Sequence, residues 1–194
     1  MNPSDAFEQR RRALEDQFFY KRDQQLVANL RKEFEALEEK LKLSHVSGIL
    51  DQRTLLDLVH AGVTAESLLA MRMVPMVIVA WSDHIVSSEE RAAILTAAAH
   101  DKIEPGSASY NLLEHWLHER PPGEVVTAWR EYVHELVKVA SPELVTELRS
   151  RTSRLCHQVA LASNSFWALG RIPAAKQQLI DEFLNAWDPA FKPS

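Results

Sequence analysis

The chain has 194 residues and a mass of 22.1 kDa, enough for one domain or for one domain with an appendage. It contains five scattered glycines, which excludes the glycine-rich loops of the common nucleotide-binding folds. Its single cysteine, Cys156, excludes an internal disulfide and a zinc site built from cysteines. The net charge of −5 lacks the basic surplus of a general nucleic-acid binder, so we expect no nucleic-acid partner.

The sequence shows no segment that would enter a membrane. Its most apolar run, residues 68–81, is too short to span a bilayer and contains Arg72 and Pro75, so we expect a buried helix there. Residues 1–7 lack the basic and apolar pattern of a signal peptide. We therefore predict a cytoplasmic protein without stable membrane insertion.

The first expected element is one long helix over residues 5–43, which contain neither glycine nor proline. Apolar residues recur in it at alternating steps of three and four, the heptad pattern of a coiled coil: Val27, Leu30, Phe34, Leu37 and Leu41. Such a helix is roughly 57 Å long, whereas a globule of this size has a radius of gyration of about 16 Å. It either extends beyond the body and pairs with a second copy or a protein partner, or packs along the domain. In the first case Leu30, Phe34 and Leu37 are expected contacts.

A further likeness lies in the same helix. Residues 15–26, which include the aromatic pair Phe18 and Phe19, resemble the inhibitory helix of the ATP synthase inhibitor protein. In that family a charged helix inserts between catalytic subunits, so the resemblance implies a regulatory protein that binds a partner through Phe18 and Phe19. The alternative is a coiled-coil or packing helix whose charges are solvated.

The rest of the chain also has helical periodicity, and no alternating strand pattern is present. Breaks and caps are indicated by Gly62, by Ser87 with Glu90 three positions later, and by Ser141 before Pro142. The expected helices cover residues 49–61, 65–73, 75–82, 87–100, 107–120, 123–140, 141–162 and 173–187. The sequence therefore predicts an all-α fold with a long helix in residues 1–45 and a helical domain in residues 46–194.

Two stretches share one pattern, in which an apolar helix, a loop and a second helix opened by small or polar residues follow one another. Residues 74–94 resemble the signature of the tellurite-resistance TerB-like family, an alanine-rich helix followed by Ala-Asp-Gly and a Glu-Glu helix start. Residues 156–180 resemble the later repeat of that family. The resemblance covers residues 65–187. It implies a TerB-like helical bundle and a non-enzymatic binding protein linked to stress response or tellurite resistance.

The acidic turn of the first repeat is the leading candidate site. Asp83 is expected at the end of one helix, and Glu89 and Glu90 in the first turn of the next, so a tight turn can bring the three carboxylates together. Clustered oxygens suit Ca²⁺ or Mg²⁺, and the resemblance also implies an acidic, metal-binding surface. The alternative is structural, because acids in a first turn are stabilised by the helix dipole and Glu90 completes a capping box.

The sequence departs from the family pattern in each of the two repeats. His84 stands where the family has glycine, and Lys176 stands where the second repeat would have glutamate. These changes indicate either a lost ancestral function or, if His84 supplies a nitrogen ligand, a preference for a transition metal.

A second candidate is the pair His115 and His118, three positions apart on one expected helix, which could chelate zinc in a metal-dependent enzyme. No third ligand is indicated, and surface histidines are the alternative interpretation. Cys156, Trp116, Trp129 and Trp187 are expected in the core. The pair Phe166-Trp167 is expected in a loop, either tucked inward or on a partner surface.

Overall fold

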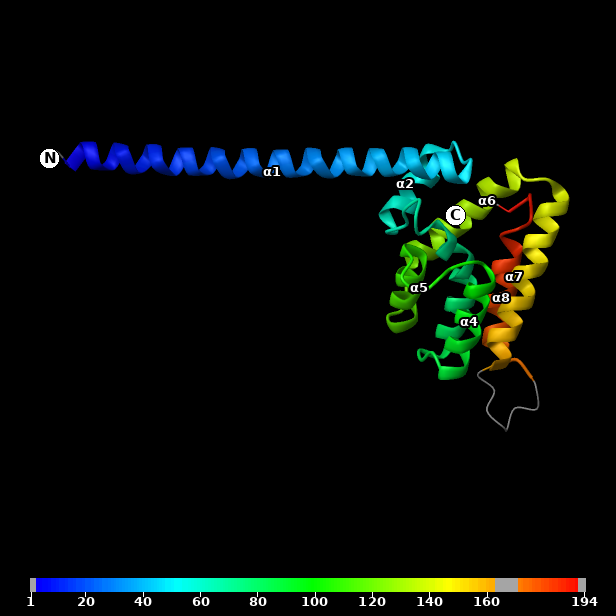
Figure 1. Ribbon diagram of the computed structural model, residues 1–194. Coiled ribbons are helices and arrows are strands. Elements are labelled where there is room, and N and C mark those ends of the chain that lie inside the picture. The colour runs from blue at the N-terminus through cyan, green and yellow to red at the C-terminus, as the bar shows by residue number, and fades with distance from the viewer. Residues whose placement is uncertain (1–2, 163–170, 192–194) are drawn as a thin grey trace. The chain divides into compact units, whose positions relative to one another are not determined.

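The computed structural model describes residues 3–162 and 171–191, with side chains at Lys21 and from residue 24 onward. Every regular element in these residues is helical, as the sequence predicts: α1 (Pro3–Ser47), α2 (Gln52–His60), the 3₁₀ helix η1 (Leu68–Met73), α3 (Val74–Ala80), the 3₁₀ helix η2 (Trp81–Asp83), α4 (Ser88–His100), α5 (Ala108–His118), α6 (Gly123–Val139), α7 (Pro142–Ala162) and α8 (Ala174–Asn185) (Figure 1). The chain divides into two compact units, Met1–Glu39 and Lys40–Ser194, whereas the sequence analysis placed the boundary after residue 45.

The first unit consists of most of α1. This helix runs for 45 residues and ends at Ser47, just before Gly48. Gly48 has φ +73°, the left-handed conformation that glycine adopts without strain, and its N–H donates to the carbonyl of Ser44 at 3.0 Å. The side chains of Phe18 and Phe19 lie outside the described residues.

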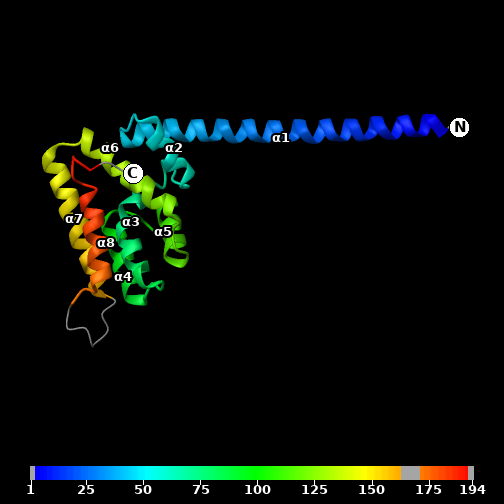
Figure 2. The same ribbon diagram turned by 180° about the vertical axis from the view of Figure 1, so that it is seen from behind.

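The second unit is built around α3, in which all seven residues are buried. Its sequence is wholly apolar, and Pro75 lies in the first turn, where the missing N–H breaks no helical hydrogen bond. α3 contacts α6, α7 and α8, α4 packs on α7, and α2 packs on α6. Figure 2 shows α3, α4, α7 and α8 together in this unit. The apolar run 68–81 is thus a buried segment, and the part of the chain that the structure describes contains no helix long and apolar enough to cross a membrane.

The cap signals in the sequence are confirmed. Ser87 Oγ accepts from the N–H of Glu90, and the Glu90 carboxylate accepts from the N–H of Ser87, which completes the capping box of α4. At the start of α5, Ser107 accepts from the N–H of Tyr110, while Ser109 donates to the carbonyl of Glu66. Gly62 has φ +75° just after α2.

The prediction of a helix over residues 65–73 is wrong in type. A turn follows Thr64, whose hydroxyl accepts from the N–H of Ser67, and η1 begins at Leu68. Pro75 has no N–H to donate to the carbonyl of Met71, so an α-helical hydrogen-bond ladder could not continue unbroken from η1 into α3.

The residues expected in the core are confirmed there. Trp129 contacts Phe183 edge to face at a centroid distance of 5.0 Å and Trp187 at 6.3 Å. Trp116 and Cys156 are buried as well, and burial raises the pKa of the Cys156 thiol to about 12, so this thiol is not a nucleophile at neutral pH. Phe166 and Trp167 lie outside the described residues.

Candidate functional site

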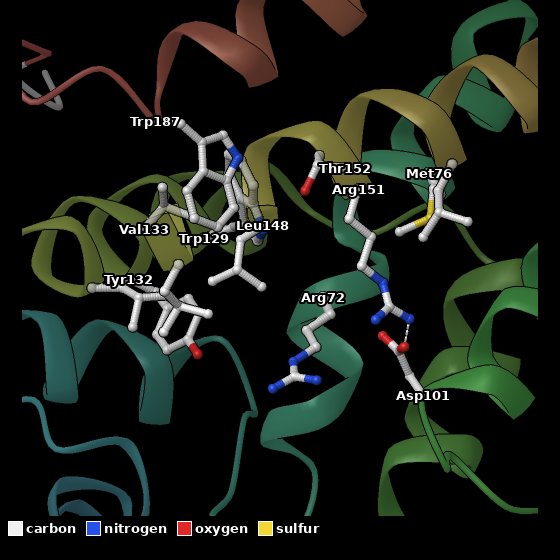
Figure 3. Close-up of a pocket in the computed structure, with 13 residues that line it drawn as sticks. Arg72, Met76, Asp101, Trp129, Tyr132, Val133, Leu148, Arg151, Thr152 and Trp187 are labelled. Carbon is white, nitrogen blue, oxygen red and sulfur yellow. Dashed lines mark ion pairs between the residues drawn. The ribbon is translucent and has the colours of Figure 1, made fainter. Parts of the chain in front are cut away.

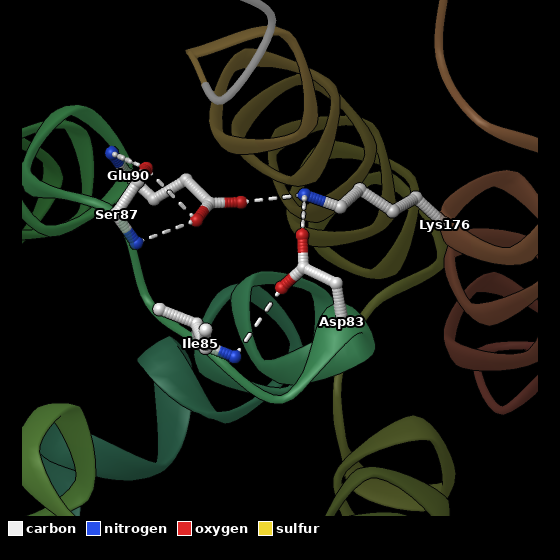
Figure 4. Close-up of polar contacts among 5 residues, drawn as sticks. All are labelled: Asp83, Ile85, Ser87, Glu90 and Lys176. Atoms are coloured by element: carbon white, nitrogen blue, oxygen red, sulfur yellow. Dashed lines mark hydrogen bonds and ion pairs between the residues drawn. The ribbon is translucent and has the colours of Figure 1, made fainter.

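The acidic turn brings together two of its three predicted carboxylates, and a lysine lies between them (Figure 4). Asp83 ends η2, Glu90 lies in the first turn of α4, and Lys176 comes from α8, 86 positions further along the chain than Glu90. The Lys176 Nζ lies 2.6 Å from Glu90 Oε1 and 3.7 Å from Asp83 Oδ2. A cation is therefore already present in this turn, and it belongs to the chain itself.

Both oxygens of the buried Glu90 carboxylate have partners. Oε1 accepts from Lys176, and Oε2 accepts from the N–H and the hydroxyl of Ser87 at 2.9 and 3.0 Å. The side chains of Glu90 and Lys176 are only 1% and 3% exposed. A buried ion pair offsets its desolvation cost only when its remaining hydrogen bonds are made, and for Glu90 they are made.

The other two predicted residues of the turn do not join this cluster. Glu89 is exposed, and hydrogen bonds from its own N–H and from the Ser88 hydroxyl lower the pKa of its carboxyl. His84 is exposed and has φ +70°, a left-handed conformation that favours glycine. Glycine is also the residue that the family resemblance predicts at this position. Within residues 3–162 and 171–191, no group of three or more His, Cys, Asp or Glu side chains is placed to hold a metal ion. A Ca²⁺ or Mg²⁺ site at Asp83, Glu89 and Glu90 stays a prediction, and such an ion would have to displace Lys176.

Lys176 is the residue of this cluster whose role the sequence analysis missed. The sequence pattern indicates only that Lys176 replaces an acidic residue of the second repeat. In the structure, its ammonium group is the counter-charge for the carboxylates of the first repeat. The only signal in the sequence was a lysine at the repeat position where an acid is expected.

The histidine pair of α5 lies on the surface. His115 and His118 are both exposed, and His118 Nε2 lies 3.8 Å from Glu114 Oε2. Glu114 is itself paired with Arg91 of α4, which holds the pKa of the Glu114 carboxyl below its usual value despite the opposing effect of burial. Among the described residues, no group of three or more His, Cys, Asp or Glu side chains includes these two histidines.

The heptad residues of α1 form an exposed apolar stripe. We define the α1 stripe by five side chains, each between 46% and 67% exposed: Val27, Leu30, Phe34, Leu37 and Leu41. Leu26, beside it, is 58% exposed. Near the end of the same helix, Leu43 is fully buried in the second unit, and it lies off the line of the stripe. The sequence pattern identified these residues, and the structure leaves them in solvent.

A cavity of about 180 Å³ lies within the second unit (Figure 3). Its wall combines aromatic side chains of α6 and the C-terminal segment with charged side chains of η1, α7 and the end of α4. The principal residues are Trp129, Tyr132, Trp187, Arg72, Arg151 and Asp101. Sequence reasoning missed this cavity because its lining comes from five separate segments, none of which carries a recognisable motif.

A pair of acidic side chains lies where α2 meets α6. Glu131 of α6 is buried, and burial together with the neighbouring Asp57 of α2 raises the pKa of its carboxyl to about 7. The Glu131 carboxyl is therefore close to half-protonated near neutral pH.

No family model matches the chain, and neither a curated protein nor a solved structure matches it.

Proposed function

We propose that this chain is a non-enzymatic interaction protein that self-associates through α1. The observation that carries this proposal is the exposed α1 stripe. Exposed apolar residues scattered singly are ordinary, but five at heptad spacing form a continuous seam along one helix face. Most of the stability of a helix in a protein comes from the packing of its apolar face, so burial of this seam against a second helix would stabilise α1.

Charge complementarity favours a second copy of the same helix as the partner. With Val27, Phe34 and Leu41 at heptad positions a, and Leu30 and Leu37 at positions d, the flanking e positions are Arg31 and Glu38, and the flanking g positions are Glu33 and Lys40. These e and g residues set the partner and the orientation in coiled coils.

Antiparallel pairing matches these charges. When Phe34 faces Leu37 of the second copy, Arg31 lies beside Glu38 of that copy and Glu33 lies beside its Lys40. Twofold symmetry repeats both attractive pairs. Parallel pairing would instead place Glu33 beside Glu38 of the second copy, which is repulsive. We therefore propose an antiparallel homodimer.

The test is sedimentation equilibrium of the full chain and two variants. We expect wild type to dimerise and Phe34→Glu to raise the dimer dissociation constant at least about a hundredfold, because it places a charge in the centre of the apolar seam. The matched control is Lys32→Glu, an exposed residue of the same helix at position f, away from the seam, which should leave the dissociation constant almost unchanged. A monomeric wild type, or equal effects of both variants, would contradict the proposal.

The proposal retains the TerB-like type for the helical domain, with stress response or tellurite resistance as the setting that the resemblance implies. The contacts between the two stretches that resemble this family support the assignment. Residues 74–94 include α3 and the start of α4, residues 156–180 include the end of α7 and the start of α8, and α3 contacts both α7 and α8. Lys176 of the second stretch binds the acidic turn of the first.

A further inference from the structure

We propose that the cavity beside α6 and α7 binds a small aromatic carboxylate, with its ring among Trp129, Tyr132 and Trp187 and its carboxylate at Arg72 and Arg151. This inference is independent of self-association, because no residue of α1 lines the cavity.

The charged part of the cavity has an excess of positive charge. Arg151 is ion-paired with Asp101, whose side chain is 2% exposed. Arg72 has no carboxylate partner in the part of the chain that the structure describes, so one carboxylate faces two guanidinium groups. Burial, followed by the charges of Arg72 and Arg154, lowers the pKa of Arg151. An added carboxylate would relieve this repulsion, and guanidinium groups bind carboxylates through paired hydrogen bonds.

The apolar part of the cavity has the size and composition for one aromatic ring. Cavities of about 150 Å³ accommodate benzene, and this one measures about 180 Å³. Figure 3 shows Trp129, Tyr132 and Trp187 on one side of the cavity and Arg72, Arg151 and Asp101 on the other. A ligand with one apolar end and one anionic end matches this division.

Exposed side chains in the cavity lining include Arg72, Arg151 and Leu144, the last 43% exposed. Arg72 is exposed and the Arg151 side chain is 36% exposed, whereas Trp129 and Trp187 are 2% and 6% exposed. The carboxylate would therefore lie at the exposed arginines, and the ring would lie against the two buried indoles.

The experiment is a titration of the full chain with phenylacetate, followed by calorimetry and by the indole N–H signals in NMR spectra. We expect saturable binding with a dissociation constant below about 1 mM, with shifts of the Trp129 and Trp187 signals and none of Trp116. The neutral isostere phenylacetamide should bind at least about tenfold more weakly, because it lacks the charge that Arg72 and Arg151 recognise.

The decisive variant is Arg72→Gln, because Arg72 is exposed and its removal leaves no buried charge without a partner. It should weaken phenylacetate binding at least about tenfold. Arg120→Gln is the control, since Arg120 is an exposed arginine outside the cavity wall, and it should leave binding within about twofold. Three results would each overturn the proposal: no saturation up to about 10 mM, equal binding of acid and amide, or unchanged binding by Arg72→Gln.

Discussion

At the scale of single residues, Lys176 shows how the two similar stretches of the chain are joined. Its ammonium group is buried between an exposed carboxylate, Asp83, and a buried one, Glu90. Removal of one partner from a buried pair leaves an uncompensated charge in the core, whereas loss of an exposed partner costs little. The two carboxylates therefore make unequal contributions to stability.

Lys176→Met is expected to lower the free energy of unfolding by about 3–5 kcal/mol, because it retains the apolar bulk and leaves the Glu90 charge buried without its counter-ion. Asp83→Asn, at a side chain that is 59% exposed, should lower it by less than about 1 kcal/mol. Urea unfolding of the two variants beside wild type measures both effects. Equal losses in the two variants would show that the buried pair is not the main contact.

Glu131 gives the stability of the fold a defined pH dependence. In the unfolded chain its carboxyl titrates near 4.5, and in the folded chain near 7. Below pH 4 the Glu131 carboxyl is largely protonated in both the folded and the unfolded chain, so it does not lower the free energy of unfolding. Between the two values only the unfolded state loses its proton, and the free energy of unfolding falls as pH rises.

Glu131→Gln should therefore raise the free energy of unfolding by on the order of 2 kcal/mol at pH 8 and hardly at all at pH 4. Denaturant unfolding at both pH values measures the difference. The control, Glu147→Gln, alters an exposed side chain of α7 and should change neither value appreciably. If Glu131→Gln raised the free energy of unfolding equally at both pH values, the cause would be something other than protonation of Glu131.

At the scale of elements, the sequence predicts most helix ends because their signals are local. The Ser87–Glu90 capping box lies at the start of α4, and Gly62 lies just after the end of α2. Both signals act within a few residues of the helix end, so both could be recognised without a structure. The interval 65–73 was not predicted correctly, since its apolar spacing also suits the 3₁₀ geometry that the chain adopts before Pro75.

The contacts between elements were much harder to predict. The pairing of Lys176 with Glu90 spans 86 positions, and the cavity assembles side chains from residue 72 to residue 187. Neither has a periodic signal in the sequence. The acidic turn could be proposed as a candidate site from Asp83 and Glu90, but the lysine that binds both carboxylates could not.

At the scale of the whole molecule, the two units carry different proposed roles. The helical domain holds the buried ion pair and the cavity, and α1 carries the apolar stripe. In the proposed dimer, the α1 stripe binds the stripe of a second copy in antiparallel orientation. It depends on Glu38, because this residue lies beside Arg31 of the second copy in an antiparallel dimer and beside Glu33 in a parallel one.

The dimer dissociation constant of Glu38→Arg, measured by sedimentation equilibrium beside that of wild type, tests this claim most directly. The antiparallel dimer predicts weaker association, because the substitution places two arginines together at both symmetry-related contacts on the flank of the seam formed by the e positions, and high salt should reduce the difference. Tighter association would contradict the claim by indicating a parallel dimer. An unchanged dissociation constant would show that these charges do not lie at the interface.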